Sequence, residues 1–338
     1  MRRSLFGGKI LFTVLAVLIA GMLASNTALA QQATNEIPLG GGGGGIGGVT
    51  ADAGGGTTAT YEAGGPESLV YDGTYVWITR QFKDAVVRLR AIDGLGRSSF
   101  TVGTRPVALV VAGTSVWVAN LQSDNVMKLR ASDGLQLGTY AVGDGPGGLA
   151  YDGTNIWVAN RNSNDVTKLR ASDGLKLGTY AVGRRPLGIA FLGGNVWVAN
   201  QLDDTVTKLR ASDGLNLGTY KVGDGPFGVA SDGANIWVTN FFGKSVTKLR
   251  AADGFVLGTF PVGYDPAGIS FDGTYIWIAN SGENTVVRVH NSGSVVATYS
   301  TGKSPFGVVF DGTNVWSANF ASDTVSTSNA AAGGPTLP

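Results

Sequence analysis

The chain contains no cysteine, one histidine and few glutamates, and each shortage excludes a kind of chemistry. Without cysteine there can be no disulfide bond, thiolate zinc site or cysteine nucleophile, so packing alone must hold the fold together. The histidine is His290, and the glutamates after residue 30 are Glu36, Glu62, Glu67 and Glu283. No Ser/His/Asp set and no paired-carboxylate motif stands out from chance spacing, so we expect no recognisable catalytic group of residues.

Charge is also sparse, at 14% of 338 residues with a formal net charge of +1. Such a chain has no overall field that would steer it towards nucleic acid, and we expect no nucleic-acid partner. Segments 143–148 and 223–228 match the G-x-G-x-x-G pattern of dinucleotide-binding proteins, but that pattern requires a following helix. Here a strand pattern follows, so we interpret both segments as turns and expect no cofactor.

The N-terminus carries the pattern of an export signal. Arg2, Arg3 and Lys9 precede an apolar run over residues 10–23, and small residues at Ala28 and Ala30 form a cleavage site. We predict a signal peptide over residues 1–30 and a flexible glycine-rich linker over residues 31–56. The alternative is an uncleaved membrane anchor, for which the apolar run is short. We expect a periplasmic or secreted protein without membrane insertion after signal cleavage.

What the chain has in abundance is repetition. The segment PGGLAYDGTNIWVAN, at residues 146–160, recurs seven times with small changes. Its tryptophan recurs every 40 residues, and after 39 residues in the last interval: Trp77, Trp117, Trp157, Trp197, Trp237, Trp277 and Trp316. Self-similarity at this period is typical of propellers and solenoids.

Each repeat carries four short strand signals. In the third copy they cover residues 147–151, 155–160, 166–171 and 177–183, separated by Asp-Gly or glycine-rich turns. We therefore predict an all-β fold, a seven-bladed β-propeller of four-stranded antiparallel blades, over residues 57–328. The second strand is apolar without alternation, which indicates that neighbouring blades cover both its faces. The tryptophans are thus expected to form the core rather than a ligand cage.

The ends of the repeat region indicate how the ring closes. The last copy lacks a fourth strand, whereas TTATYEAGGP at residues 57–66 resembles LGTYAVGDGP at residues 137–146, one residue short. We predict that this N-terminal strand completes the last blade and leaves no open sheet edge there. Residues 329–338 are expected to form a disordered tail.

The repeat resembles the YVTN-type propeller repeats, because residues 237–240 are Trp-Val-Thr-Asn and other copies carry Trp-Val-Ala-Asn. More loosely, the chain is similar to NHL-type propellers and to virginiamycin B lyases, seven-bladed enzymes that open a cyclic streptogramin. These resemblances imply a seven-bladed ring, frequent export, and binding or lyase chemistry at one mouth of the channel. The lyase resemblance also implies histidine and glutamate near a divalent ion, an arrangement that one histidine cannot reproduce.

The copies differ most in two sets of loops. The loops between the second and third strands and the turns between blades vary freely, and both should emerge on one face because antiparallel strands return there. Loops on a rigid scaffold are where binding groups lie, although neutral drift would also concentrate in loops. The predicted binding residues on this face are Arg80, Phe82, Arg105, Arg161, Arg184, Arg185, Phe227, Phe241, Phe242, Tyr264, Phe306 and Phe320.

The third strands carry a basic belt: Lys128, Arg130, Lys168, Arg170, Lys208, Arg210, Lys248 and Arg250. An aspartate follows three residues after each of these arginines. We favour a solvated edge with locally neutralised charge over a polyanion-binding rim. His290 replaces the belt arginine in the sixth blade and is interpreted in the same way.

Two functions remain open. The first is an exported, monomeric, non-enzymatic propeller that binds a protein, peptide or polysaccharide on its variable loops. The second is a lyase or hydrolase of the virginiamycin B lyase type with its site at the channel mouth. The single histidine and the scarcity of glutamate favour the first. A third possibility is recent amplification of the repeat with little selected chemistry.

Overall fold

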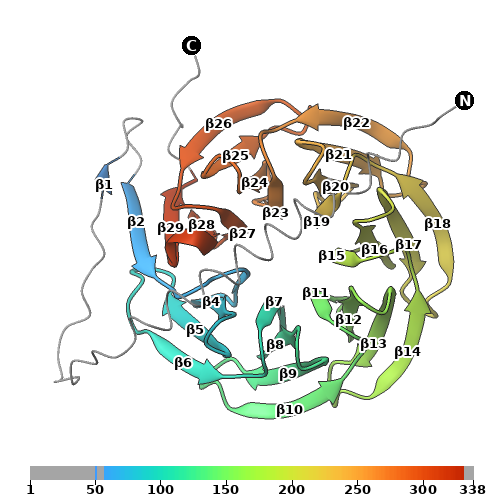
Figure 1. The fold of residues 1–338 in the computed structure, drawn as a ribbon, viewed down its shortest axis with the longest axis horizontal. Coiled ribbons are helices and arrows are strands. Elements are labelled where there is room, and N and C mark those ends of the chain that lie inside the picture. Colours follow the sequence, from blue (N-terminus) through green and yellow to red (C-terminus); the bar gives the residue numbers. More distant parts are fainter. Residues whose placement is uncertain (1–49, 52–56, 331–338) are drawn as a thin grey trace, which may run out of the picture. The chain divides into compact units, whose positions relative to one another are not determined.

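The computed structural model describes residues 50–51 and 57–330, so the predicted signal peptide, most of the predicted linker and residues 331–338 lie outside the described part. The chain divides into two compact units, of which Ile46–Pro338 contains every described strand. These strands form seven antiparallel sheets around a central axis (Figure 1). The prediction of an all-β, seven-bladed propeller is therefore confirmed.

Each blade runs from an inner strand at the channel to an outer strand at the rim (Figure 1). The first three blades consist of β3 (Leu69–Tyr71), β4 (Tyr75–Arg80), β5 (Ala85–Arg90) and β6 (Ser98–Thr101); β7 (Pro106–Ala112), β8 (Ser115–Asn120), β9 (Asn125–Arg130) and β10 (Gln136–Ala141); and β11 (Pro146–Tyr151), β12 (Asn155–Asn160), β13 (Asp165–Arg170) and β14 (Lys176–Ala181).

The next three blades repeat the same order. They consist of β15 (Pro186–Leu192), β16 (Asn195–Asn200), β17 (Thr205–Arg210) and β18 (Asn216–Lys221); β19 (Pro226–Ser231), β20 (Asn235–Asn240), β21 (Ser245–Arg250) and β22 (Val256–Pro261); and β23 (Pro266–Phe271), β24 (Ile276–Asn280), β25 (Thr285–Val289) and β26 (Val295–Ser300).

The described part contains no helix long and apolar enough to cross a membrane. Its one helical turn is η1 (Phe320–Ser322).

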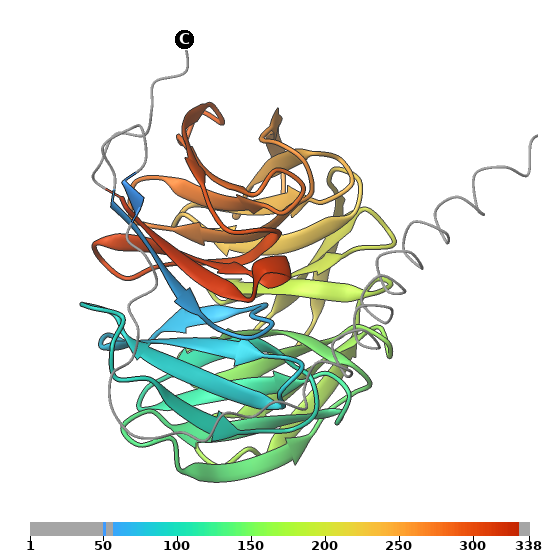
Figure 2. The same ribbon diagram turned by 60° about the vertical axis from the view of Figure 1, so that its left-hand side comes forward.

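The last blade is built from both ends of the repeat region. Its inner three strands are β27 (Pro305–Phe310), β28 (Asn314–Asn319) and β29 (Thr324–Asn329), and its outer strand is β2 (Thr57–Glu62). Strand β2 pairs antiparallel with β29, with Tyr61 opposite Val325, and Figure 2 shows the two side by side. The predicted closure by the N-terminal strand is confirmed.

Two boundaries differ slightly from those expected. Strand β29 continues through Asn329, one residue beyond the predicted end of the propeller. A short strand, β1 (Thr50–Ala51), lies within the segment predicted as linker and pairs with the start of β2. The closing blade therefore has five strands where the others have four.

The hydrophobic core lies between blades rather than within them. One cluster joins Trp117 and Val126 of blade 2 to Leu149, Ile156 and Leu169 of blade 3, and each neighbouring pair of blades repeats this arrangement. All seven tryptophans are at most 1% exposed. Because a buried indole removes about 150–250 Å² from water, this layer is the main hydrophobic connection around the ring, as predicted.

Inner strands approach one another closely, which explains a glycine near the start of five of them. A Cβ atom on Gly148 would lie 2.0 Å from the carbonyl oxygen of Leu187 in the next blade. Glycine is needed where two backbones come this near. The equivalent positions are Gly188, Gly228, Gly268 and Gly307.

The lysines of the basic belt are buried or partly buried rather than solvated, which corrects the sequence-based interpretation. Lys168 is 6% exposed and its Nζ donates to the carbonyl oxygen of Ala211 in the next blade at 2.6 Å. The same Nζ lies 5.0 Å from the centre of the Trp157 ring. Lys128, Lys208 and Lys248 make equivalent bonds, so this position connects blades. The belt arginines do match the interpretation: Arg130 and Arg170 are exposed and form ion pairs with Asp133 and Asp173.

Candidate functional site at the channel mouth

The two sets of variable loops lie on one face, as predicted, because hydrogen bonds tie them together. The amide of Leu121, after the second strand of blade 2, donates to the carbonyl oxygen of Arg105 at 2.9 Å. The amide of Arg105 in turn donates to Oδ1 of Asp84 in the neighbouring blade at 2.9 Å. Equivalent pairs recur around the ring. We call this side the variable face.

Two positions of each repeat surround the central axis on the variable face, and we call them, together with the neighbouring side chains that interact with them, the channel mouth. The inner position follows the proline of the inner strand: Glu67, Val107, Gly147, Leu187, Phe227, Ala267 and Phe306. The second position follows the second strand: Gln81, Leu121, Arg161, Gln201, Phe241, Ser281 and Phe320. Side chains from non-adjacent blades interact here, which places them near the axis.

One part of the mouth is a continuous chain of six phenylalanine rings. Phe227 of blade 5 lies 6.1 Å from Phe306 of blade 7, between ring centres, because blade 6 carries the small Ala267 between them. From Phe227 the chain continues to Phe241 at 5.7 Å and from there to Phe242 at 5.3 Å. From the other end it continues from Phe306 to Phe320 at 5.8 Å and to Phe82 at 5.6 Å.

These rings differ in exposure. Phe82, at one end of this row of rings, is 45% exposed. Phe241 is 7% exposed and packs against Phe227 and Phe242. Phe227, Phe242, Phe306 and Phe320 are partly buried. The structure thus brings together six of the predicted site residues from blades 1, 5 and 7.

The other part of the mouth is cationic. Arg105 and Arg161, from blades 2 and 3, both interact electrostatically with Glu67 of blade 1, and Arg185 of blade 4 interacts with Arg161. Burial raises the pKa of Glu67, and the two arginines act in the opposite direction. Burial lowers the pKa of Arg161 to about 10, with Arg185 and Arg105 adding to the effect and Glu67 opposing it. We call Arg105, Arg161 and Arg185 the mouth arginines.

Two mouth arginines occupy a backbone conformation that favours glycine. Arg105 has φ 58° and Arg185 has φ 54°, at the turn position before the proline. Blades 1, 3 and 5 carry glycine there: Gly65, Gly145 and Gly225. A long side chain in the left-handed region costs about 1 kcal/mol. The chain therefore carries backbone strain at two of the three arginines that bring guanidinium groups to the mouth.

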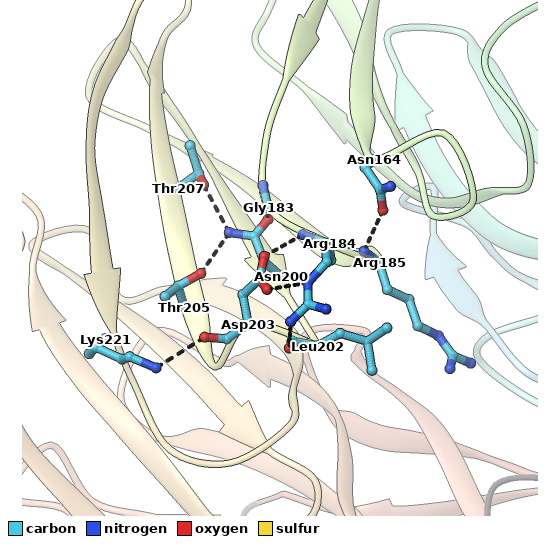
Figure 3. A network of polar contacts seen from close by, with 10 residues as sticks. All are labelled: Asn164, Gly183, Arg184, Arg185, Asn200, Leu202, Asp203, Thr205, Thr207 and Lys221. Carbon is cyan, nitrogen blue, oxygen red and sulfur yellow. Dashed lines mark hydrogen bonds and ion pairs between the residues drawn. The ribbon is translucent and has the colours of Figure 1, made fainter. Parts of the chain in front are cut away.

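Three predicted site residues lie apart from these groups. Arg184 forms an ion pair with Asp203 at 2.6 Å and donates to the carbonyl oxygen of Leu202, whereas the Arg185 side chain points away from that network (Figure 3). Tyr264 stacks under Nζ of Lys244 at 3.9 Å.

Arg80 is the third predicted site residue that lies apart from the phenylalanines and the mouth arginines. It replaces the asparagine of the other blades. Its guanidinium packs over Gly64, where a Cβ would lie 2.7 Å from Nη2. In the other blades the equivalent asparagine is buried. In five of them it bonds the third strand, as Asn200 bonds Thr205 and Thr207 in Figure 3, whereas Asn280 donates to the carbonyl oxygen of Val262.

Sequence reasoning missed two participants. Glu67 is not among the predicted site residues, although it occupies the same repeat position as Phe227 and is the one charged residue at that inner position. Gln81 is 3% exposed and its Oε1 accepts a bond from Nε of Arg105 at 3.1 Å. The position in the repeat could have signalled both, because each occupies a column that elsewhere holds predicted site residues.

A lyase-type metal centre does not fit these residues. His290 lies at the end of a third strand on the opposite side, where its Nδ1 contacts Oγ of Ser292 at 2.9 Å. The described residues contain no group of three or more His, Asp or Glu side chains that could hold a metal ion.

Solved structures share the fold. A virginiamycin B lyase from Staphylococcus aureus is 17% identical, with 80% of this chain and 98% of that chain covered and a TM-score of 0.71. A chain of the Kuenenia stuttgartiensis hydrazine synthase structure is 20% identical, with 80% and 97% covered and a TM-score of 0.73. A chain of the mitotic checkpoint complex is 13% identical, with 88% and 97% covered and a TM-score of 0.73.

These similarities establish the propeller fold and no activity. No protein-family model and no curated protein sequence matches this chain. The resemblance to YVTN and NHL repeats therefore stays a prediction, and function must be argued from the site.

Proposed function

We propose that the protein is an exported β-propeller that binds a protein or peptide ligand at the channel mouth. The observation that carries this proposal is the meeting of six phenylalanines and three arginines, from different blades, around one axis. Aromatic and arginine side chains dominate the energetics of protein interfaces. A polysaccharide, the other ligand class predicted from the sequence, is an outcome of the test below.

The rest of the molecule supports a binding role for this face. The exposed arginines that end the third strands, such as Arg130 and Arg210, are paired with aspartates, whereas no ion pair of the mouth arginines is found within the part of the chain that the structure describes. Polar groups held without a close partner on a rigid scaffold are available to a ligand. The lyase alternative gains no comparable observation, since His290 lies on the other side.

Binding at the mouth can be tested with a display library of random peptides selected on the mature chain. The double variant Phe82→Ser/Phe306→Ser should bind the selected peptides about tenfold more weakly or worse, as expected for loss of an anchoring side chain. The matched control is Leu135→Ser/Leu175→Ser, because these leucines are 51% and 52% exposed and lie beside the opposite hairpin turns. Equal binding by the phenylalanine variant, or selection of no peptide, would overturn the proposal. Binding of glycans alone would assign the mouth to a polysaccharide.

Export is a separate part of the proposal and rests on the N-terminal pattern of Arg2, Arg3 and the apolar residues 10–23. We expect the mature protein to begin at Gln31 and to be found outside the cytoplasm. N-terminal sequencing of the protein from cell fractions tests this. A full-length chain retained in the cytoplasm would contradict it.

A further inference from the structure

The mouth has two chemically different parts, and the division points to one kind of ligand. Building on the proposed function, we infer that the mouth captures the free C-terminal carboxylate of a peptide whose last side chain is apolar. The mouth arginines would bind the carboxylate and the phenylalanine chain would bind the side chain. Both groups belong to one residue of such a peptide, so a single insertion along the axis satisfies both parts.

The charge of the mouth calls for an anion. Of the three guanidinium groups, those of Arg105 and Arg161 interact with one carboxylate, that of Glu67, and that of Arg185 interacts with Arg161. Within the described residues, the side chains of the mouth arginines make one hydrogen bond, which runs from Nε of Arg105 to Oε1 of Gln81. Nε of Arg161 is buried and has no partner there. A buried donor without a partner destabilises the fold, and an incoming acceptor would remove that cost.

The size of the cationic part favours a single compact anion. Nucleic acids and other polyanions are bound by long tracks of basic residues, whereas the mouth offers three arginines bounded by Leu187 on one side and phenylalanines on the other. The planar fork of a guanidinium matches a carboxylate in two-point geometry. Capture of a chain-end carboxylate by donors at the end of a rigid scaffold is a recurring mode of peptide recognition.

Repeat positions show that the mouth arginines are not required by the fold. Gly145 and Gly225 occupy the same left-handed turn position as Arg105 and Arg185 in otherwise similar blades. Gly147 leaves open space at the inner position of blade 3, where the stem of Arg161 lies 3.7 Å from where its Cβ would be. Small residues and strained arginines together therefore place charge at the axis.

Glu67 has a defined part in this arrangement. Its carboxylate interacts with Arg105 and Arg161, and a ligand carboxylate must compete with it for these two arginines. Removal of the Glu67 charge should therefore strengthen binding of an anionic ligand, while removal of an arginine charge should weaken it. A cluster that served only stability would not give effects of opposite sign.

The test compares three probe peptides by NMR or calorimetric titration of the mature chain: acetyl-Gly-Gly-Phe as the free acid, its C-terminal amide, and acetyl-Gly-Gly-Gly as the free acid. The amide should bind about tenfold more weakly or worse, since a charge-assisted hydrogen bond is lost. The triglycine acid should also bind more weakly, because it lacks the apolar side chain.

Variants then assign the effect to named residues. Arg161→Gln should weaken binding of the phenylalanine acid by about tenfold, Glu67→Gln should strengthen it, and neither should change binding of the amide to the same extent. Arg170→Gln is the matched control, because Arg170 is exposed and paired with Asp173 beside the opposite turns. Thermal melting of each variant shows whether it is folded.

The outcomes separate this inference from the function on which it rests. If library peptides bind and need Phe82 and Phe306, but acid and amide bind equally, the mouth binds peptides and the carboxylate inference is wrong. No binding of the free-acid probe also overturns the inference. If binding needs Arg161 but prefers an acidic oligosaccharide to any peptide, the anion belongs to a glycan and the inference again fails. If no peptide depends on the phenylalanines, both proposals fail.

Discussion

The indole nitrogen of the repeat tryptophan shows how one residue of a turn stabilises a core side chain. In five blades an aspartate of the Asp-Gly turn accepts a bond from this nitrogen, for example Asp152 from Trp157 at 2.8 Å. Blades 2 and 4 have Ala112 and Leu192 in place of the aspartate, and Nε1 of Trp117 and Trp197 is buried without a partner. The same repeat thus contains satisfied and unsatisfied copies of one interaction.

These copies predict stability changes of opposite sign. Asp152→Ala should lower the free energy of unfolding by about 1–3 kcal/mol, because a buried donor loses its acceptor. Ala112→Asp should raise it by about 1 kcal/mol by supplying the acceptor that Trp117 lacks. Urea unfolding of both variants measures this. A loss of stability in Ala112→Asp would show that the turn in blade 2 cannot adopt the geometry of the other blades.

The same aspartates predict acid sensitivity. Burial alone would raise the pKa of Asp152, but bonds from Trp157, Asn155 and the backbone hold it below its usual value. A carboxylate with a lowered pKa stabilises the fold above its unfolded pKa of about 3.9, and this stabilisation is lost as the pH falls through the folded pKa. The stability difference between the wild-type chain and Asp152→Asn should therefore be largest near neutral pH and shrink below about pH 4. A difference unchanged at pH 3 would contradict this assignment.

The left-handed arginines predict a stability gain. Arg105→Gly and Arg185→Gly should leave the free energy of unfolding unchanged or raise it by up to about 1 kcal/mol, because glycine adopts this conformation without strain. Gly145→Arg, at the same position of blade 3, should lower it by about 1 kcal/mol. Thermal or urea unfolding measures both. Destabilisation by the two glycine substitutions would mean that the arginines support the fold.

At the scale of the strand, the third strands do more than fill the middle of each blade. Each lysine donates to the turn of the next blade and lies over the tryptophan of its own blade, as Lys168 does with Ala211 and Trp157. One side chain therefore joins two sheets. The next belt residue, two positions along the strand, points outwards and pairs within its own turn, as Arg170 does with Asp173. Because side chains alternate along a strand, Lys168 and Arg170 lie on the same face of the sheet, and Leu169 between them faces the core on the other side. Arg170 is exposed because it is the last residue of the strand.

This difference predicts unequal effects of neighbouring charge removals. Lys168→Met should lower the free energy of unfolding by about 1–3 kcal/mol, because the carbonyl oxygens of Ala211 and Ser212 lose their donor. Arg170→Gln should change it by less than about 0.5 kcal/mol, as is usual for a surface substitution. Chemical unfolding of the pair tests the assignment. Equal effects would mean that Lys168 is hydrated in solution.

At the scale of the whole molecule, a strand from the start of the propeller closes the ring. Strand β2 covers the edge of β29, and Tyr61 stacks on Trp316 with ring centres 5.6 Å apart. The last tryptophan therefore has its partner from the other end of the propeller. Without β2 the closing blade would expose an unpaired edge, which promotes aggregation.

Truncation tests the closure. A chain beginning at Ala63 should lose about 4 kcal/mol or more and melt roughly 10 °C lower than a chain beginning at Thr57, and it should aggregate in size-exclusion chromatography. The chain beginning at Thr57 is the control, since it retains β2. Equal melting temperatures of the two chains would show that β2 contributes little to the ring.

The sequence alone determined the number of blades, their four strands, the buried tryptophans and the strand that closes the ring. Each of these follows from local periodicity, which repeats within every copy and needs no knowledge of distant residues. The tertiary structure decided which variable residues meet. Phe227 and Phe306 approach each other past blade 6 because Ala267 there is small, and Glu67 interacts with Arg161 from a blade two positions away. It also decided that Lys168 is buried and Arg170 exposed. A repeat pattern places a residue on a face, whereas ring closure determines what its side chain reaches.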